Sequence, residues 1–223
     1  MMVIRQKQRS VLFATLVAVA LGALLGIALA SEPSVDIGAV SLANGTLTDY
    51  LTARSVGGTT GICYQNDAPK PSYACFRRAL QVSGLTDLLS GAQPVTVLAP
   101  TDAAFAHLES EVGRGAFNAF MTSPSATATF IRSSVVRGST TLADLASSAS
   151  VTSGATQLTT LAGTVLAVSF GDLGYAASRS TDVKIGSSDA VDGQSFVIHV
   201  PVRFSDGNVL IPLGRLTLLS LTT

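Results

Sequence analysis

The sequence predicts an α+β fold in which several short helices come first and β-strands follow. Between residues 46 and 131, apolar residues recur at helical spacing behind capping signals. From residue 135 onward, short runs alternate apolar and polar residues and are separated by Ser, Thr and Gly. The chain beyond the first 45 residues has the size of one domain. We therefore assign residues 46–223 to a single extracytoplasmic domain, behind a leader and a linker.

The leader contains an apolar segment at residues 11–30 that carries no charged side chain. As a helix that rises ~1.5 Å per residue, it would span about 30 Å, the thickness of a hydrocarbon core. Arg5, Lys7 and Arg9 precede it, and basic residues favour the cytoplasmic side of a membrane. Residues 1–10 are therefore predicted to be a cytoplasmic tail, and the C-terminal domain to lie outside the cytoplasm.

The leader fits either a retained transmembrane anchor or a cleaved signal peptide. The run is longer than a usual signal core, whereas Ala28-Leu29-Ala30 before Ser31 has the small-x-small form of a cleavage site. Small residues recur at every fourth position, which on a helix makes a groove suited to close helix packing in lipid. These residues are Ala14, Ala18, Gly22, Gly26 and Ala30. We favour retention, and the alanine-rich composition suggests a bacterial inner-membrane protein.

The N-terminal half of the domain is predicted to be helical. Residues 31–45 form a linker, and Thr46 with Asp49 has the pattern of a capping box before a short helix. Residues 57–71 are rich in Gly, Thr, Asn and Pro and indicate a loop. The apolar spacing that follows predicts one helix over residues 73–89.

A short buried strand is predicted at residues 95–98, and it leads directly into a helix. Thr101 is a favourable N-cap, and Asp102 lies where the helix dipole favours a negative charge. Two more short helices follow, around residues 117–121 and from Ser123-Pro124 through residue 131.

Strands are predicted for the rest of the chain. They fall near residue 151, near residues 158–161, at 165–168, at 183–185, at 196–204 and at 209–219. Pro201 interrupts one of them, which suggests an edge strand or a bulge. Asp206-Gly207 is the turn signal of a hairpin.

Two blocks of this sequence resemble the signatures of fasciclin-like domains. The first is LTDLL at residues 85–89 followed by PVTVLAPTDAAF at residues 94–105, close to the family's T-V-F-A-P-T-D and A-A-F. Its motif residues are Thr96, Pro100, Thr101, Asp102 and Phe105. The second lies at residues 130–138, where the family usually ends Tyr-His-Val-Val-Pro-Gly. Residues 158–163 are similar to its Thr-Leu-x-Gly strand.

This resemblance covers residues 46–219 and implies a wedge-shaped β-sandwich with a layer of short helices. It also implies an extracytoplasmic, non-catalytic role in adhesion or protein contact. In the second block Ser133 and Ser134 replace Tyr and His, and Arg137 replaces Pro. In the family the Tyr-His pair is associated with core packing and partner binding, so its replacement bears on ligand recognition more than on the fold.

Cys63 and Cys75 are the only cysteines in the sequence. An even count outside the cytoplasm favours a disulfide, and closing a loop of this length adds ~3 kcal/mol in the chain-entropy model. A metal site or a redox pair is the alternative. A metal would need two further ligands, and the spacing is not C-x-x-C.

Little else in the sequence indicates chemistry. Charged residues make up 13% of the chain, the net charge is +0, and no basic stripe indicates nucleic acid. His107 and His199 lack partners at metal-binding spacing, and the sequence contains no nucleophile elbow, P-loop or dinucleotide fingerprint. We expect no catalytic residues, metal, cofactor or small-molecule substrate.

The function predicted from these observations is that of a non-catalytic, membrane-anchored scaffolding or accessory subunit. Its expected partners are other membrane-protein subunits and the lipid bilayer. The alternative is a secreted or cell-surface adhesion or matrix-binding protein, cleaved after Ala30.

Overall fold

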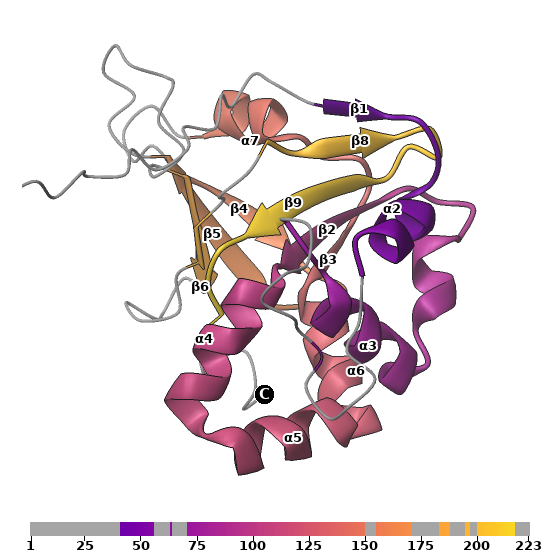
Figure 1. Ribbon diagram of the computed structural model, residues 1–223. Coiled ribbons are helices and arrows are strands. Elements are labelled where there is room, and N and C mark those ends of the chain that lie inside the picture. The colour runs from indigo at the N-terminus through magenta and orange to yellow at the C-terminus, as the bar shows by residue number, and fades with distance from the viewer. Residues whose placement is uncertain are drawn as a thin grey trace, which may run out of the picture. The chain divides into compact units, whose positions relative to one another are not determined.

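The computed structural model describes residues 41–55, 63, 71–149, 155–170, 183–187, 195–196 and 200–216 (Figure 1). The chain divides into two units, Met1–Ser31 and Glu32–Thr223, and every described residue belongs to the second. The predicted tail, the apolar segment at residues 11–30 and its small-residue stripe lie outside the described residues. Within the described ranges, no helix combines the length and apolar character needed to cross a bilayer.

Six α-helices occur in the described part of the chain. They are α2 (Leu47–Ala53), α3 (Ala74–Ser83), α4 (Asp102–Val112), α5 (Arg114–Thr122), α6 (Pro124–Ser133) and α7 (Leu142–Ser148), with a 3-10 helix at Thr86–Leu89. Thr46 and Asp49 form the predicted capping box of α2, and Ser123 caps α6 ahead of a proline at its start.

The strands form two sheets. The five-stranded sheet has the order β1 (Ser41–Ala43), β8 (Val202–Phe204), β9 (Val209–Leu213), β2 (Val95–Pro100) and β3 (Val135–Arg137). The four-stranded sheet has the order β4 (Ala155–Thr159), β5 (Val165–Phe170), β6 (Val183–Ser187) and β7 (Ser195–Phe196). The second sheet is antiparallel throughout, whereas β2 pairs in parallel with β9 and β1 with β8. The predicted α+β class is therefore confirmed, with a mixed sheet at its centre.

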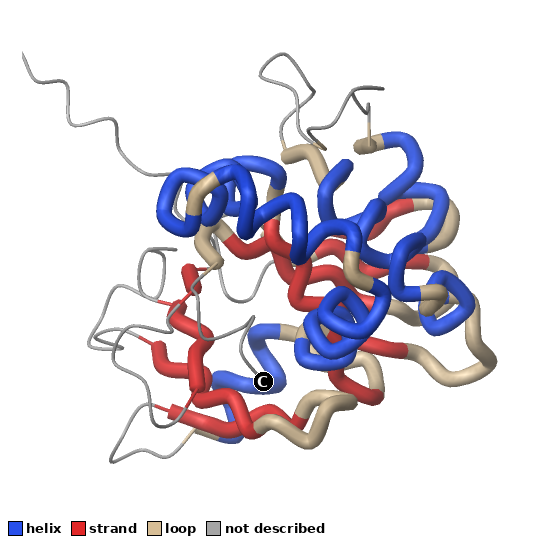
Figure 2. The backbone as a smooth tube through the Cα atoms, turned by 90° about the horizontal axis from the view of Figure 1, so that it is seen from below, coloured by secondary structure: helices blue, strands red, loops and turns tan. Residues whose placement is uncertain are grey.

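The five-stranded sheet is buried on both faces at β2 and β9. Val95, Val97 and Ala99 of β2 belong to a core shared with α2 through α6, whereas Leu98 faces a second core. That second core contains residues of α7, β4, β5 and β9. Alternate residues of a strand point to opposite faces, so the helices cover one face and the four-stranded sheet with α7 covers the other. Figure 2 shows most of the helices gathered on one side of the strands.

The structure corrects the prediction of a single helix at residues 73–89. α3 ends at Ser83 because Gly84 adopts the left-handed conformation, with φ 67°, and its amide bonds the carbonyls of the last turn. A separate 3-10 helix follows at Thr86–Leu89. Sequence reasoning counted the apolar spacing across Gly84 and overlooked its role as a helix terminator.

Three further differences concern α7, β1 and the last strands. α7 falls where only strands were predicted, although Thr141 and Asp144 form a capping box at its start. β1 lies inside the predicted linker and pairs with β8. The last strand ends at Leu213, and its Pro212 lies beyond the β8 ladder, which pairs only as far as Leu210. Proline therefore removes no hydrogen bond of that ladder.

Candidate functional site

The first signature block forms the junction between β2 and α4, at the centre of the described fold. β2 is buried along its whole length, and Thr101 then caps α4, its hydroxyl accepting from the Ala104 amide at 3.4 Å. The Thr101 amide itself donates to the Leu213 carbonyl at the end of β9. Pro100, with its fixed φ, ends the buried strand, and the capping residue Thr101 begins the helix.

Thr96 holds the turn that follows β3. Its buried hydroxyl donates to the Gly138 carbonyl at 2.7 Å and accepts from the Thr140 amide at 2.8 Å. Because Thr141 caps α7 one residue later, Thr96 also sets where α7 begins. Among the residues that the structure describes, the Thr96 hydroxyl binds only main-chain atoms.

Asp102 joins α4 to the start of α3. Its Oδ1 accepts from the Cys75 amide at 2.8 Å, and its Oδ2 accepts from the Ala74 amide at 3.1 Å. Tyr73, the N-cap residue of α3, provides no side-chain bond to those orphan amides. Asp102 is only 3% exposed, so a charge-assisted cap from a distant helix replaces the usual local one.

Cys75 lies in this first turn of α3 and forms the predicted disulfide with Cys63. Both cysteines are buried. Asp102 and the disulfide therefore hold the same helical turn, one through main-chain amides and the other through a covalent link. Residues 64–70, between the cysteines, lie outside the described ranges.

Phe105 anchors the helical layer. Its ring makes edge contacts with the rings of Phe117 and Phe130, at centroid distances of 6.4 and 5.8 Å. All three rings are buried. They connect α4, α5 and α6, so the last residue of the block lies where three consecutive helices pack together.

The second signature block forms the turn from α6 into β3. Ser134 is the C-cap of α6, and its hydroxyl donates to the Phe130 carbonyl at 2.9 Å. Its own carbonyl accepts from the Leu98 amide of β2 at 2.8 Å. Serine at this buried position thus satisfies its polar group locally, without the larger Tyr and His side chains usual in the family.

A buried hub around Asn208 was missed by sequence reasoning. Its Oδ1 accepts from the Val95 amide at 2.8 Å, and its Nδ2 donates to the Leu89 carbonyl and to Asp206 Oδ2, both at 2.9 Å. Asp206 also accepts from the Leu47 amide at the start of α2. The hairpin turn between β8 and β9 therefore fastens α2, the 3-10 helix and β2. Asn directly after the Asp206-Gly207 turn signal was the only available clue.

Comparison with known families decides the identity of this fold. Residues 71–200 match the family model of the fasciclin domain. The chain belongs to this family. The resemblance read from residues 94–105 is therefore confirmed, and membership of the family supports a non-catalytic role in adhesion or protein binding.

A solved structure is also similar to this fasciclin domain. It is a FAS1 domain pair from the insect cell adhesion molecule fasciclin I, 14% identical, with a TM-score of 0.43. The match covers 64% of this chain and 44% of that chain, so it spans less than half of the insect pair. A search of curated proteins gave no match.

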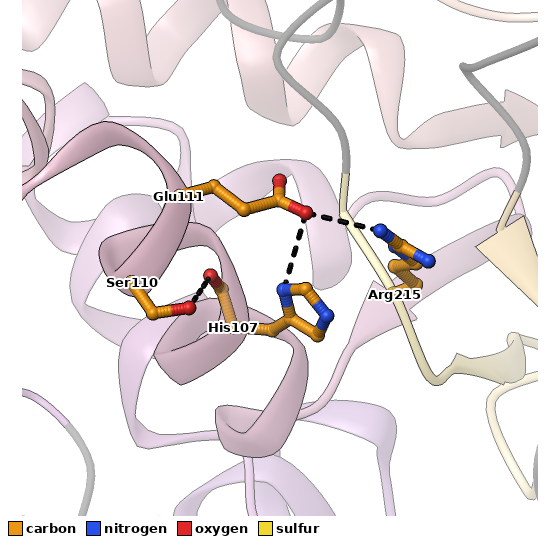
Figure 3. A network of polar contacts seen from close by, with 4 residues as sticks. All are labelled: His107, Ser110, Glu111 and Arg215. Atoms are coloured by element: carbon orange, nitrogen blue, oxygen red, sulfur yellow. Dashed lines mark hydrogen bonds and ion pairs between the residues drawn. The ribbon is translucent and has the colours of Figure 1, made fainter.

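The fasciclin domain also has a surface cluster in which a hydroxyl, an imidazole and a carboxylate come together (Figure 3). His107 Nδ1 lies 3.3 Å from Glu111 Oε1, and Arg215 contacts the same oxygen at 3.0 Å. The Ser110 hydroxyl donates to the backbone carbonyl of His107 and not to its ring (Figure 3). Within the described residues this arrangement does not form the hydroxyl-to-imidazole hydrogen bond of a catalytic triad, because the Ser110 hydroxyl donates to a main-chain carbonyl. It instead fastens the segment after β9 to α4.

The polar groups of the fasciclin domain described so far bind main-chain atoms or one another. Both oxygens of Asp102 accept amides, and the Asn208 amide group is bonded on both sides. Among the described residues, no group of His, Cys, Asp and Glu could hold a metal ion. His199 lies outside the described residues. These polar groups therefore have a structural role, because they fix the helices, the strands and the disulfide-linked turn to one another.

Proposed function

We propose that this chain is a non-catalytic accessory subunit anchored in the bacterial inner membrane. Its fasciclin domain would lie outside the cytoplasm and link or brace other membrane-protein subunits. The observation that carries the protein-binding part is membership of the fasciclin family over residues 71–200. Within the described part of the chain, the buried motif residues Asp102, Thr96 and Phe105 contact only the framework of the domain, so a protein partner would bind its surface residues.

The disulfide between Cys63 and Cys75 supports the proposed compartment. Disulfides persist in oxidising surroundings such as the periplasm and are rare in the cytoplasm. Alkylation of free thiols at the moment of lysis, followed by mass measurement, tests this. We expect no label without reductant and two labels after reduction. Complete labelling without reductant contradicts the proposed location.

The anchor is supported by the leader sequence. Residues 11–30 are free of charge and long enough to span a bilayer, and Gly22 and Gly26 form a G-x-x-x-G pattern for helix packing. We expect the full-length protein to stay in the membrane fraction after alkaline carbonate extraction, with its N-terminal residues still attached.

A second candidate function is a cleaved, secreted adhesion protein. Ala28-Leu29-Ala30 before Ser31 favours it, as the form of a signal-peptidase site. Carbonate extraction combined with N-terminal sequencing of the mature protein separates the two candidates. A mature start at Ser31 with release into the periplasm or medium supports secretion and excludes the anchor.

A further inference from the structure

The segment between β1 and α2 contains an Asn-Gly pair with open geometry. Asn44 is exposed, and Gly45 has a φ of 104°, in the region that favours glycine. Within the described part of the chain, neither the Asn44 side chain nor the Gly45 amide makes a hydrogen bond. Neither of the two reacting groups, the Asn44 amide and the Gly45 nitrogen, is therefore held by a hydrogen bond of its own.

We propose that Asn44 is a site of spontaneous deamidation in the folded protein. The Gly45 nitrogen, after losing its proton to hydroxide, attacks the carbonyl carbon of the Asn44 side chain. A bond forms between these two atoms, the bond from that carbon to the Asn44 Nδ2 breaks, and ammonia leaves. Water then opens the cyclic imide at either carbonyl, giving aspartate or, with the backbone rerouted through the side chain, isoaspartate. Glycine as the following residue places no side chain in the path of attack.

A second pair of the same kind provides the comparison. Asp206-Gly207 can form the same cyclic imide, although more slowly and with loss of water instead of ammonia. Its carboxylate accepts from the Leu47 amide, the Asn208 main-chain amide and the Asn208 Nδ2. The Gly207 amide donates to the Phe204 carbonyl at 3.0 Å. Both reacting groups are thus held apart, and the pair is protected where Asn44-Gly45 is open. A third pair, Asp192-Gly193, lies outside the described residues.

Isoaspartate at position 44 would disturb the attachment of α2. On one side Ala43 pairs with Phe204, and on the other the Gly45 carbonyl accepts from the Ser205 amide at 3.2 Å and from its hydroxyl at 2.8 Å. An extra methylene in the backbone between these two anchors prevents both from keeping their register.

The test is incubation of the purified full-length protein at mildly alkaline pH under native conditions. Isoaspartate is then labelled with an isoaspartyl methyltransferase and assigned by peptide mapping. We expect the isoaspartate label and the mass change of deamidation at Asn44, and no label at Asp206. Neither change is expected at Asn118, an exposed asparagine of α5 followed by alanine. Asn44→Gln should lose the label at that peptide, because its longer side chain does not close the five-membered imide.

Two results would overturn the proposal. One is modification of Asp206 as early as that of Asn44. The other is modification of Asn44 only after unfolding in denaturant, since the claim concerns the folded protein. A lower melting temperature of the aged protein than of the Asn44→Asp variant separates the backbone effect from the added charge, and is expected if isoaspartate detaches α2.

Discussion

Asp102 accepts a hydrogen bond of 2.8 Å from the backbone amide of Cys75, the residue that carries the disulfide to Cys63. The aspartate of the family motif therefore acts as the helix cap of α3 from a position 27 residues away. This relationship explains why the motif and the disulfide belong to one structural unit.

Replacing Asp102 with alanine should destabilise the domain. Two buried amides would lose their acceptor, at a cost of about 1–3 kcal/mol each before relaxation. We expect a lower free energy of unfolding in urea with an unchanged denaturant slope. Asp87→Ala, an exposed aspartate of the 3-10 helix, is the matched control and should change stability by no more than ~0.5 kcal/mol. Equal stability of the two variants would contradict the capping role.

Asn208→Ala should lower the free energy of unfolding at least as much as Asp102→Ala. It removes the acceptor of the Val95 amide and the donor to the Leu89 carbonyl, both buried, at a cost of about 1–3 kcal/mol each. Asn118→Ala on the exposed face of α5 controls for the loss of an amide and should be neutral. Thermal unfolding of both variants measures the difference. A melting temperature unchanged by Asn208→Ala would contradict the stabilising role of the Asn208 hydrogen bonds.

Tyr73→Phe should leave stability unchanged or raise it by about 1 kcal/mol. The ring is fully buried, and within the described structure its hydroxyl has no hydrogen-bond partner. Burial raises the pKa of this hydroxyl, followed by a smaller contribution from Tyr50. Above a pH of about 10, the hydroxyl ionises in the unfolded chain but stays protonated in the folded protein, because its folded-state pKa is raised. The folded protein therefore loses stability as pH rises above the unfolded value.

The variant should therefore resist alkaline unfolding better than the native protein. The measurement is the unfolding midpoint between pH 8 and about 11, the range that brackets tyrosine ionisation. A large loss of stability at neutral pH in Tyr73→Phe would mean that the hydroxyl has a partner after all.

Asp144 should give the domain an acid-sensitive component of stability. The Thr141 amide and then its hydroxyl, at 2.8 and 2.7 Å, lower the pKa of this carboxyl. A lowered folded-state pKa stabilises the fold above the unfolded value and loses this effect as pH falls through the folded value. The native protein and Asp144→Asn should thus differ slightly at neutral pH, and the difference should shrink as pH falls from about 4 through the lowered folded-state pKa. If the two proteins still differ in stability in acid, the effect of the substitution comes from packing and not from the charge of Asp144.

Local signals predicted much of this architecture. The capping residues Thr46, Thr101 and Ser123 each begin a helix as expected, because an N-cap acts on its own turn. The disulfide followed from the number of cysteines and the predicted compartment. The break at Gly84 was missed because helical spacing of apolar residues continues across it.

Long-range relationships were beyond sequence reasoning. Asp102 was predicted only as a favourable charge at the start of its own helix, whereas its main partners are amides of α3. Asn208 binds groups 113 and 119 residues away, and nothing in the local sequence indicates those contacts. The parallel pairing of β2 with β9 could not be predicted for the same reason: the register between distant strands depends on the packed core and not on local sequence.

The most direct test of the proposed scaffolding role is co-purification of the full-length protein in mild detergent, with the Gly22→Leu/Gly26→Leu variant alongside. The account predicts that the native protein brings down a defined set of membrane subunits. The variant should remain in the membrane and lose them, because leucine fills the groove needed for close helix packing. Recovery of the same subunits with both proteins, or of none with the native protein, would contradict it.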